Sequence, residues 1–201
     1  MTQPAPTPQT ATTGDAPDEV VLLAPDGTPC GTAPRATVHD TDTPLHLAFS
    51  CWVLGPDGRL LVTRRALSKR TWPGVWTNSF CGHPRPGEPM DDAVTRYAHH
   101  ELGLRVHDVR RVLPDYRYRA VDASGVVEHE VCPVHLARTD DVPTPHPDEV
   151  AELVWTDPRA LLRACASTPW AFSPWMVEQA RGLRAALLET QVAGGGRPSG
   201  A

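Results

Sequence analysis

Apolar residues occur in short runs along much of this chain, and turn-forming residues separate most of the runs. The runs cover residues 19–24, 45–54, 60–64, 116–121, 126–137 and 152–155. Pro56-Asp57-Gly58 separates the second run from the third, and Ala123-Ser124-Gly125 separates the fourth from the fifth. Short apolar runs bounded by Pro, Gly, Asp and Ser are typical of β-strands and turns. The pattern therefore predicts six strands, four of them paired as two hairpins.

Helical spacing replaces this pattern in three other segments. Between the hairpins, apolar residues recur every three or four positions at Met90, Ala93, Val94, Tyr97, Ala98 and Leu102. Pro89 suits the first helical position and Gly103 the position just past the end. A second helix is predicted from Asp157-Pro158 towards Cys165, and a third opens at Ser173-Pro174 with Met176, Ala180, Leu183 and Leu187 on one side. Strands interrupted by helices predict an α+β fold, in which helices cover a mixed β-sheet.

The length of the chain and the composition of its ends predict one domain. A chain of 201 residues suits a single domain of ordinary size. Residues 1–18 are rich in Pro, Thr and Ala and poor in apolar side chains, so we expect a disordered N-terminal tail. Residues 193–201 include the consecutive glycines 194–196, which predict a flexible C-terminal tail. The folded domain is expected over residues 19–192.

Charge and hydropathy restrict the class of partner. The formal net charge is -5, and no basic stripe with interleaved aromatic residues is present, so we expect no nucleic-acid partner. No apolar stretch reaches the ~18 residues of a membrane span, and the first residues lack the basic and apolar regions of a secretory signal. We therefore expect a cytoplasmic protein that acts on a small molecule, either as a monomer or as a weak homodimer.

Cysteine and lysine usage adds two observations. The five cysteines (Cys30, Cys51, Cys81, Cys132 and Cys165) show no Cys-x-x-Cys spacing. In a cytoplasmic chain this indicates free thiols, not a disulfide framework or a structural zinc site. Of the 19 basic residues only Lys69 is a lysine, so its surroundings are of interest.

One motif that carries candidate chemistry begins at Gly82. Its residues are Gly82, Glu88, Arg96 and Glu101, separated by five, seven and four residues. The spacing resembles the box of the Nudix superfamily, a loop-helix-loop that binds a divalent metal against a diphosphate, although a capped amphipathic helix would show a similar pattern. Nudix hydrolases hold their metals with several helix glutamates, and here Tyr97 and His100 occupy two of those positions. The sequence therefore favours diphosphate binding over hydrolysis.

Three histidines and two glutamates form a second group of candidate residues. The group consists of His39 and His46 in a polar loop, His83 after Cys81-Gly82, and Glu128 and Glu130 in a predicted strand. Residues two apart in a strand point to the same face. Imidazoles together with carboxylates suit Mn²⁺, Zn²⁺ or a similar divalent ion. Each histidine alone would equally suit a surface or hydrogen-bonded position, as we expect for His99, His100, His107, His129, His135 and His146.

Four separate segments resemble the type I isopentenyl-diphosphate isomerases, which are Nudix proteins that isomerise and do not hydrolyse. The segments are HDTDTPLHLAFS (39–50), LVTRRALSKRTWPGVWTNSFCGHP (61–84), YRYRAVDASGVVEHEVCP (116–133) and TPWAFSPWMV (168–177). The resemblance covers about residues 20–180, nearly the whole expected domain. It implies a Nudix fold and an isomerase of isoprenoid biosynthesis that interconverts isopentenyl diphosphate and dimethylallyl diphosphate.

The resemblance also implies a role for each matching residue. It implies one divalent metal, Mn²⁺ or Zn²⁺, held by His39, His46, His83, Glu128 and Glu130, and a Mg²⁺ that Glu101 helps to hold against the substrate diphosphate. Cys81 and Glu130 match the catalytic pair, Tyr118 stands beside Glu130, and Trp175 matches the aromatic residue at the hydrocarbon end. Arg65 and Lys69 match the diphosphate contacts, and Arg35 stands where the family often has a lysine. Tyr97 stays without a role.

The reaction itself requires such residues. Moving the double bond adds a proton to an alkene and removes one from a neighbouring carbon, through a tertiary carbocation that water would trap. Coordination to a cation makes a carboxyl group more acidic, which favours Glu130 as the forward donor and Cys81 as the acceptor; the reverse step exchanges the roles. Two alternatives stay open from the residues alone: a Nudix hydrolase of a nucleotide or prenyl diphosphate, and a non-catalytic metal-binding module.

Overall fold

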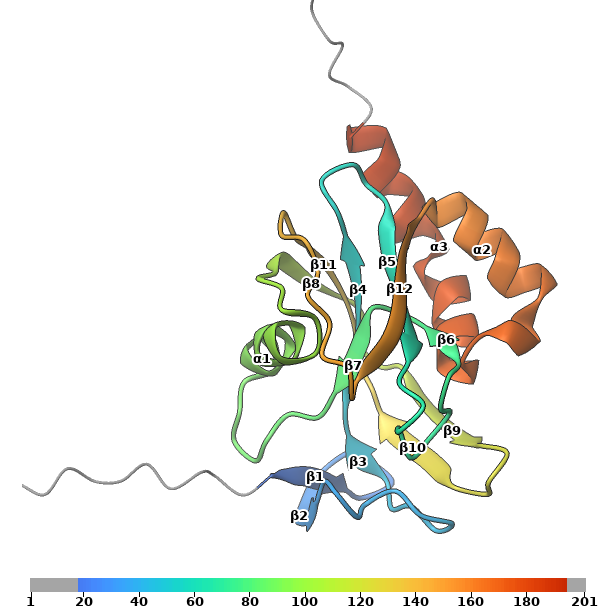
Figure 1. Ribbon diagram of the computed structural model, residues 1–201. Helices are drawn as coiled ribbons and strands as arrows, with labels where there is room; N and C mark the ends of the chain where they lie inside the picture. Colours follow the sequence, from blue (N-terminus) through green and yellow to red (C-terminus); the bar gives the residue numbers. More distant parts are fainter. Residues whose placement is uncertain (1–17, 195–201) are drawn as a thin grey trace, which may run out of the picture.

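A computed structural model describes residues 18–194 of the protein (Figure 1). The predicted N-terminal tail, apart from Asp18, lies outside the described residues, as do residues 195–201 of the predicted C-terminal tail. None of the helices in the described part is long and apolar enough to cross a membrane.

Two β-sheets form the framework. The first sheet has five strands in the order β2-β1-β3-β10-β9. Its strands are β1 (Glu19–Leu23), β2 (Pro29–Pro34), β3 (His46–Leu47), β9 (Arg117–Val121) and β10 (Val127–Val131). The second sheet has seven strands, with the path β12-β5-β4-β11-β8 and with β6 on β5 and β7 on β4. Its strands are β4 (Phe49–Leu54), β5 (Leu60–Arg65), β6 (Trp76–Thr77), β7 (Phe80–Gly82), β8 (His107–Leu113), β11 (Val134–Arg138) and β12 (Val150–Thr156).

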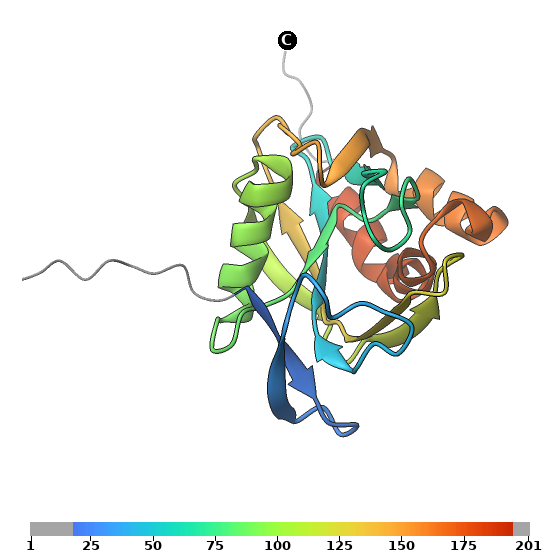
Figure 2. The ribbon, with the colours of Figure 1, turned by 60° about the horizontal axis from the view of Figure 1, so that its bottom comes forward.

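Two parallel segments join the sheets. β3 continues into β4 and β10 continues into β11, and in both sheets the two segments pair in parallel. Between the sheets, Ala48 N donates to Val131 O at 2.9 Å and Ser50 N donates to Pro133 O at 3.1 Å, so the pairing is uninterrupted. The first sheet, with the β1–β2 hairpin projecting from it, thus lies at one end of this segment pair (Figure 2). Glu128 and Glu130 on β10 and Cys81 on β7 line the pocket described below.

Helices cover both faces of the second sheet (Figure 1). One face packs on α1 (Met90–Leu102), and the other on α2 (Pro158–Ser167) and α3 (Pro174–Gly194), with a 3-10 turn at Pro169–Ala171 between the last two helices. Alternate side chains of a strand point to opposite faces. In β4, Phe49, Cys51 and Val53 therefore join the core under α1, and Trp52 and Leu54 join the core under α3. This arrangement confirms the predicted α+β fold with a mixed sheet.

The three predicted helices are present, with small differences at their ends. Pro89 is the residue before α1 and not its first helical residue, and Gly103 ends the helix with φ 64°, as expected for a C-terminal glycine. α2 begins at Pro158, and the Asp157 carboxylate accepts a hydrogen bond from Ala160 N. α3 extends to Gly194, so it includes the first two residues of the predicted flexible tail.

The strand predictions were right in position and incomplete in number. The run 45–54 is divided between β3 and β4, and the run 126–137 is divided between β10 and β11, where Cys132-Pro133 passes from one sheet to the other. The hairpin between β4 and β5 and the hairpin between β9 and β10 are both present. The prediction missed β2, β6, β7 and β8, because β6 and β7 have only two and three residues and Arg110 and Arg111 interrupt the apolar pattern of β8.

Gly82 shows why the motif at the start of α1 needs a glycine. A Cβ atom placed on Gly82 would lie 2.6 Å from three ring carbons of Tyr97. Contacts under 3.0 Å do not occur between a real Cβ and a ring, so a larger residue would force β7 and α1 apart. The last residue of β7 and the neighbouring Cys81 and His83 are therefore held close to the helix.

Candidate active site and metal centre

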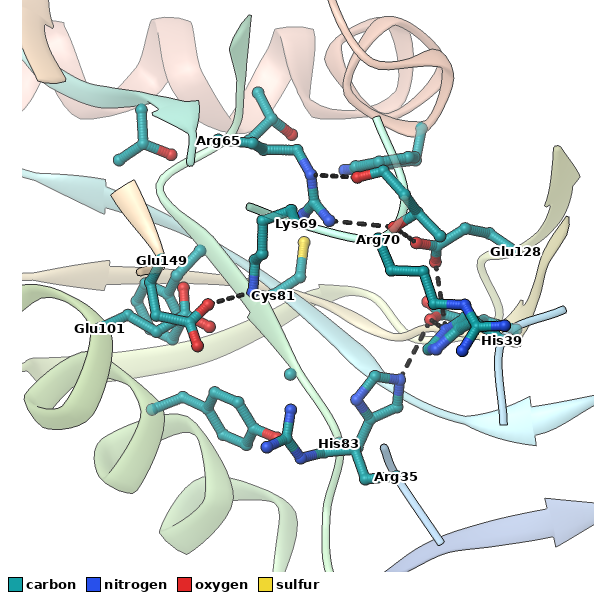
Figure 3. Close-up of a pocket in the computed structure, with 18 of the residues that line it drawn as sticks. Arg35, His39, Arg65, Lys69, Arg70, Cys81, His83, Glu101, Glu128 and Glu149 are labelled. Carbon is teal, nitrogen blue, oxygen red and sulfur yellow. Dashed lines mark hydrogen bonds and ion pairs between the residues drawn. The ribbon is translucent and has the colours of Figure 1, made fainter. Parts of the chain in front are cut away.

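One pocket of about 280 Å³ collects nearly all the residues singled out in the sequence (Figure 3). Eleven of them line it: Arg35, His39, Arg65, Lys69, Cys81, His83, Glu101, Tyr118, Glu128, Glu130 and Trp175. The twelfth, His46, is fully buried next to the pocket and contacts His83 and Glu130. The pocket has a histidine and carboxylate end, a cationic end, and a sulfur and aromatic surface between them.

Strand pairing assembles the histidine end. His46 on β3 is the direct partner of Glu130 on β10 in the parallel ladder, and Tyr118 on β9 is the cross-strand partner of Glu130 on the other side. His83 directly follows β7, whose pairing with β4 brings it to the same place. One ligand atom each from His39, His46, His83 and Glu130 lie within 4.8 Å of one another, which is a cluster that could hold a metal ion.

The nitrogen atoms of this cluster are oriented as a metal would require. His46 Nδ1 lies 2.9 Å from the carbonyl oxygen of Pro44, which only accepts, so Nδ1 carries the proton of the neutral ring. Its bare Nε2 then faces His83 Nε2 at 3.2 Å. His83 Nε2 also lies 3.2 Å from Glu130 Oε1, so imidazole nitrogens and a carboxylate oxygen converge on one space, as the binding of a divalent cation requires.

Burial reinforces this assignment. His39 Nε2 is buried and has no hydrogen-bond partner; it lies 3.7 Å from Glu128 Oε2 and 3.8 Å from Glu130 Oε1. A buried nitrogen without a partner is costly, and a bound cation would satisfy it. Burial also lowers the pKa of His83 to about 4, so this ring is neutral and available as a ligand at neutral pH. The donor set therefore fits a divalent metal ion.

Glu128 lies at the edge of the cluster. Its Oε1 accepts a hydrogen bond from Thr71 Oγ1 at 2.5 Å and its Oε2 lies 3.0 Å from the Tyr118 hydroxyl. The same hydroxyl lies 3.0 Å from Glu130 Oε2, which shows that the two glutamates share a face as their spacing predicts. The structure thus brings four of the five predicted ligands within mutual reach of one ion and places Glu128 beside them.

Cys81 lies between the two ends of the pocket. Its sulfur is 3.2 Å from the hydroxyl oxygen of Ser50, its direct partner in the β4–β7 ladder. Asn78 Nδ2 lies 3.4 Å from the sulfur and donates at shorter distances to two backbone carbonyls. Burial raises the pKa of the Cys81 thiol to about 12, and the hydrogen bonds with Ser50 and Asn78 act against this shift.

Trp175 and Tyr118 contribute aromatic rings to the pocket lining, and Trp72 packs behind them. Trp175 is 1% exposed, and its indole Nε1 donates to Asn78 Oδ1 at 3.1 Å. Trp72 packs edge-to-face on Trp175 with ring centroids 5.2 Å apart, and Tyr118 lies at 5.6 Å. The backbone of Trp72 has φ 43°, a conformation that non-glycine residues rarely adopt and that functional loops often retain.

Cations gather in another part of the pocket lining, the cationic end. Arg65 is held in place by hydrogen bonds to the backbone oxygen and hydroxyl of Thr71, both at 3.0 Å. Arg35 pairs with Asp18 at 2.8 Å, and Lys69 forms an ion pair with Glu149. Arg70 also lines the pocket and makes no ion pair with any residue of the described part of the chain (Figure 3). Four positive side chains in one concave region make this end suitable for a polyanion.

The remaining residues of the Nudix-like motif have a structural role. Arg96 binds Glu88 through two hydrogen bonds of 2.7 and 2.6 Å and also donates to the backbone oxygen of His83 at 3.2 Å. Glu88 in turn accepts from the backbone nitrogen of Arg85 at 2.8 Å. This bidentate pair fastens the loop before α1 to the helix, so of the motif's carboxylates only Glu101 lines the pocket.

The histidines assigned no metal lie outside the cluster. His100 and His146 stack on each other with ring centroids 5.5 Å apart, and His107 contacts Asp108 and Asp140. His135 is buried beside Phe49, and neither ring nitrogen has a hydrogen-bond partner. Burial lowers the pKa of His135, so it packs as a neutral aromatic ring.

Two charged residues that line the pocket were missed by the sequence analysis. Glu149 precedes β12 in a polar turn, and Arg70 is one arginine among many; neither carries a local signal. Tyr97, left without a role, also lines the pocket, and its ring lies 4.7 Å from the guanidinium carbon of Arg96. The pairing of Glu149 with the single lysine is visible only in three dimensions.

Similarity to known proteins is extensive. The model of the NUDIX domain matches residues 44–176. A protein of Agromyces mediolanus named isopentenyl-diphosphate Delta-isomerase is 64% identical over 162 residues, which are 81% of this chain and 79% of the relative. A protein of the same name from Leifsonia xyli subsp. xyli is 60% identical over 185 residues, which are 91% of this chain and 96% of the relative.

Solved structures show the same fold at lower identity. The crystal structure of DR0079 from Deinococcus radiodurans has a TM-score of 0.62 at 20% identity, covering 81% of this chain and 97% of that one. The MutT protein from Methanosarcina mazei Go1 has a TM-score of 0.55 at 16% identity, covering 71% and 96%. At these identities the likeness concerns the arrangement of strands and helices alone.

Proposed function

The chain belongs to the NUDIX domain family and, within it, to the isopentenyl-diphosphate Delta-isomerases; from this premise we propose that it interconverts isopentenyl diphosphate and dimethylallyl diphosphate in isoprenoid biosynthesis. The observation that carries the proposal is the position of Cys81, in one pocket between a metal-binding cluster and a cationic end. This is the arrangement that a small alkene with a diphosphate group needs. Cytoplasmic location and a monomeric or weakly dimeric state stay predictions from the sequence.

The diphosphate group is assigned to the cationic end and the hydrocarbon to the aromatic part. Arg65 has its guanidinium fixed by Thr71, so its orientation is set before a ligand arrives. Arg35 and Lys69 add charge on the same side of the pocket. Holding the diphosphate there orients the five-carbon chain towards Cys81 and Trp175.

Cys81 and Glu130 are the proposed proton-transfer groups. One adds a proton to the terminal carbon of the double bond, the adjacent tertiary carbon becomes cationic, and the other removes a proton from the next carbon, so that the bond re-forms one position along. The groups come from different sheets, Cys81 from β7 and Glu130 from β10. Each direction of the reaction uses the same two groups in exchanged roles.

The polypeptide's own electrostatics bear on which group starts with the proton. Burial raises the pKa of Cys81 to about 12, which favours a thiol. Burial opposes ionisation of Glu130, but the three imidazoles near it hold its pKa well below the ordinary value, which favours a carboxylate. These two pKa shifts favour Cys81 as the group that carries the proton at the start. On the basis of metal coordination, the sequence favoured Glu130 as the donor. Label uptake from deuterated water distinguishes the two assignments.

Trp175 and its neighbours are proposed to protect the cation. An indole face attracts a positive charge, and Tyr118 and Trp72 pack around Trp175 so that its ring position is fixed. The near-complete burial of Trp175 and the 3% exposure of Glu130 indicate a site from which water is largely excluded.

Two divalent ions are proposed. His39, His46, His83 and Glu130, with Glu128 beside them, would hold Mn²⁺ or Zn²⁺, and Glu101 would help to hold Mg²⁺ against the diphosphate. A bound divalent ion supplies Lewis acidity to a carboxyl ligand and charge to balance a diphosphate. The chain's own residues orient the ligands, as shown by the Pro44 carbonyl that fixes the His46 tautomer.

Hydrolysis of a diphosphate is the competing function, and the structure offers it little support. Tyr97 is buried with its ring against Gly82, and His100 is exposed and faces Glu149 at 3.9 Å, so neither replaces the helix glutamates of a hydrolase. The test is to incubate the protein with isopentenyl diphosphate, with and without added divalent metal, and to measure both dimethylallyl diphosphate and released phosphate. Metal-dependent isomer without phosphate is expected; phosphate without isomer would replace the proposal by the hydrolase.

A further inference from the structure

A carboxylate in the cationic end of the pocket requires an explanation. Glu149 lines the same pocket as Arg35, Arg65, Lys69 and Arg70, where the diphosphate is proposed to bind (Figure 3). Its carboxylate forms an ion pair with Lys69 and lies 3.9 Å from His100 Nε2. A negative side chain in an anion site opposes binding unless a cation stands between the two.

The backbone holds Glu149 in this position. Thr144 N donates to Leu102 O at 2.7 Å and His146 N donates to Glu101 O at 2.8 Å, so the segment before β12 satisfies the last carbonyls of α1. Ala66 N then donates to Glu149 O at 3.0 Å, which ties the segment to the loop that carries Lys69. Three backbone bonds thus fix Glu149 beside the end of α1, where Glu101 lies.

Glu101 is a second carboxylate at this place, and it lacks a partner. Its side chain is buried, with 7% exposure, and it lines the pocket next to Lys69 and Glu149 (Figure 3). Within residues 18–194 no group forms a hydrogen bond or an ion pair with its carboxylate. A carboxylate that is more than nine-tenths buried, unpaired and directed into a pocket indicates a missing cation.

We propose that Glu149 is a ligand or water-mediated ligand, together with Glu101, of a divalent cation that the diphosphate brings into the pocket, and that Lys69 leaves Glu149 for the phosphate oxygens when this cation binds. The inference rests on the proposed diphosphate function and adds to it a residue outside the Nudix-like motif. Glu149, from the segment before β12, then joins Glu101 in place of a helix glutamate that the motif lacks. The Lys69–Glu149 ion pair is the form taken when no cation is bound.

The two roles of Glu149 have opposite consequences for anion binding. Without Mg²⁺, Glu149 repels the diphosphate and occupies Lys69, so its neutralisation strengthens binding. With Mg²⁺, Glu149 helps to hold the cation that bridges to the phosphates, so its neutralisation weakens binding. A residue that only supported the fold would change both affinities in the same direction.

The experiment measures the affinity of inorganic pyrophosphate by titration calorimetry, with and without Mg²⁺, on protein loaded with Mn²⁺ at the histidine cluster. Without Mg²⁺, we expect Glu149→Gln to bind pyrophosphate more tightly than wild type does. Mg²⁺ should increase the pyrophosphate affinity of Glu149→Gln by a factor at least about 5-fold smaller than in wild type, because about 5-fold is the lower end of typical coupling between two ligands. Formation of the magnesium–pyrophosphate complex in solution is common to all variants and cancels in this comparison.

Glu152→Gln is the matched control, because Glu152 is exposed, pairs with Arg64 and does not line the pocket. It should behave as wild type in both titrations. Glu149→Asp keeps the charge and should retain part of the Mg²⁺ gain. An unchanged Mg²⁺ gain in Glu149→Gln, or weaker binding both with and without Mg²⁺, would overturn the inference. Because pyrophosphate binding is measured without turnover, a failed isomerase assay leaves this result interpretable.

Discussion

The Ser50 hydroxyl lies 3.2 Å from the Cys81 sulfur, and the core fixes the direction of the hydrogen bonds that reach it. Trp52 Nε1 can only donate, and it donates to Gln179 Oε1 at 2.9 Å, so the Gln179 amide presents its nitrogen to Ser50, also at 2.9 Å. Ser50 Oγ therefore accepts from Gln179, and its own proton is left for a sulfur atom. The available sulfur atoms are Cys81 and, at 3.4 Å, Cys132.

Replacement of Ser50 by Ala should lower kcat about 10-fold and leave KM nearly unchanged, because the hydroxyl contacts the reacting sulfur and no part of the diphosphate end. Steady-state kinetics with isopentenyl diphosphate provide the measurement. Gln179→Leu keeps the hydroxyl but removes its orienting donor, so a smaller decrease in kcat is expected. A rise in KM without a decrease in kcat would show that Ser50 does not act through Cys81.

Loss of His46 should remove the metal from the histidine cluster. His46→Ala deletes an Nε2 atom that faces both His83 and Glu130, so metal content measured by atomic emission should fall from near one ion per chain to well below half, together with turnover. Glu128→Ala is expected to reduce both by a smaller factor, since Glu128 lies at the edge of the cluster. His129→Ala is the control, because His129 lies between Glu128 and Glu130 in β10 and its Nδ1 contacts the Thr43 carbonyl oxygen instead of the cluster. Full metal content in His46→Ala would disprove the assignment.

Removal of a positive charge at the diphosphate end should raise KM. Arg65→Ala and Lys69→Ala each delete a cation that lines the pocket, and we expect KM to rise about 10-fold or more in each, with a smaller decrease in kcat from misplacement of the alkene. Arg64→Ala is the matched control, since Arg64 is adjacent in β5 but points to the opposite side and pairs with Glu152. If Arg65→Ala and Lys69→Ala show the same KM as Arg64→Ala, Arg65 and Lys69 do not bind the diphosphate.

The helices and the outline of the site follow from the sequence because their signals are local. The spacing of Met90, Val94, Tyr97 and Leu102 is a property of one segment, and α1 forms there. Likewise, the two-residue spacing of Glu128 and Glu130 determines that they share a face. Four of the five predicted metal ligands meet in space; their grouping was predictable in full only from the family resemblance, because spacing alone does not associate separate segments.

Glu149 and Ser50 were not predictable because their roles depend on distant contacts. Glu149 owes its position to backbone bonds between its segment and the end of α1, far away in the sequence. Ser50 is a small polar residue in a buried strand, and only its neighbours Cys81 and Gln179 distinguish it from a packing residue. The strands β6 and β7 have two and three residues, too few for an alternating pattern to be recognised.

The buried Glu101 carboxylate should make the stability of the metal-free protein depend on pH. Burial, together with the charge of Glu149, raises the pKa of Glu101 from 4.5 to about 7. A raised pKa in the folded state means that stability is fully present below about pH 4.5 and is lost as the pH rises through 7. A shift of this size corresponds to roughly 3 kcal/mol at most.

Urea unfolding in the presence of EDTA at pH 5 and pH 8 measures this loss. Wild type should lose stability between the two pH values relative to Glu101→Gln, which cannot ionise at this position. In samples without EDTA, Mg²⁺ with pyrophosphate should restore part of the loss at pH 8. The same pH dependence in both proteins would show that Glu101 is not held in an unfavourable ionised state.

Label uptake from deuterated water separates the roles of Cys81 and Glu130. Cys81→Ala and Glu130→Gln should each abolish net isomerisation, because each removes one of the two proton-transfer groups. If Glu130 protonates the alkene, Cys81→Ala still adds deuterium at the terminal carbon, since the carbocation can lose a proton back to Glu130, whereas Glu130→Gln adds none. If the buried thiol starts with the proton, as its raised pKa favours, the pattern is reversed and only Glu130→Gln incorporates label. Mass spectrometry and NMR of recovered isopentenyl diphosphate distinguish the two outcomes. Robust isomerisation by Cys81→Ala would contradict both assignments, because the alkene would then react without the sulfur.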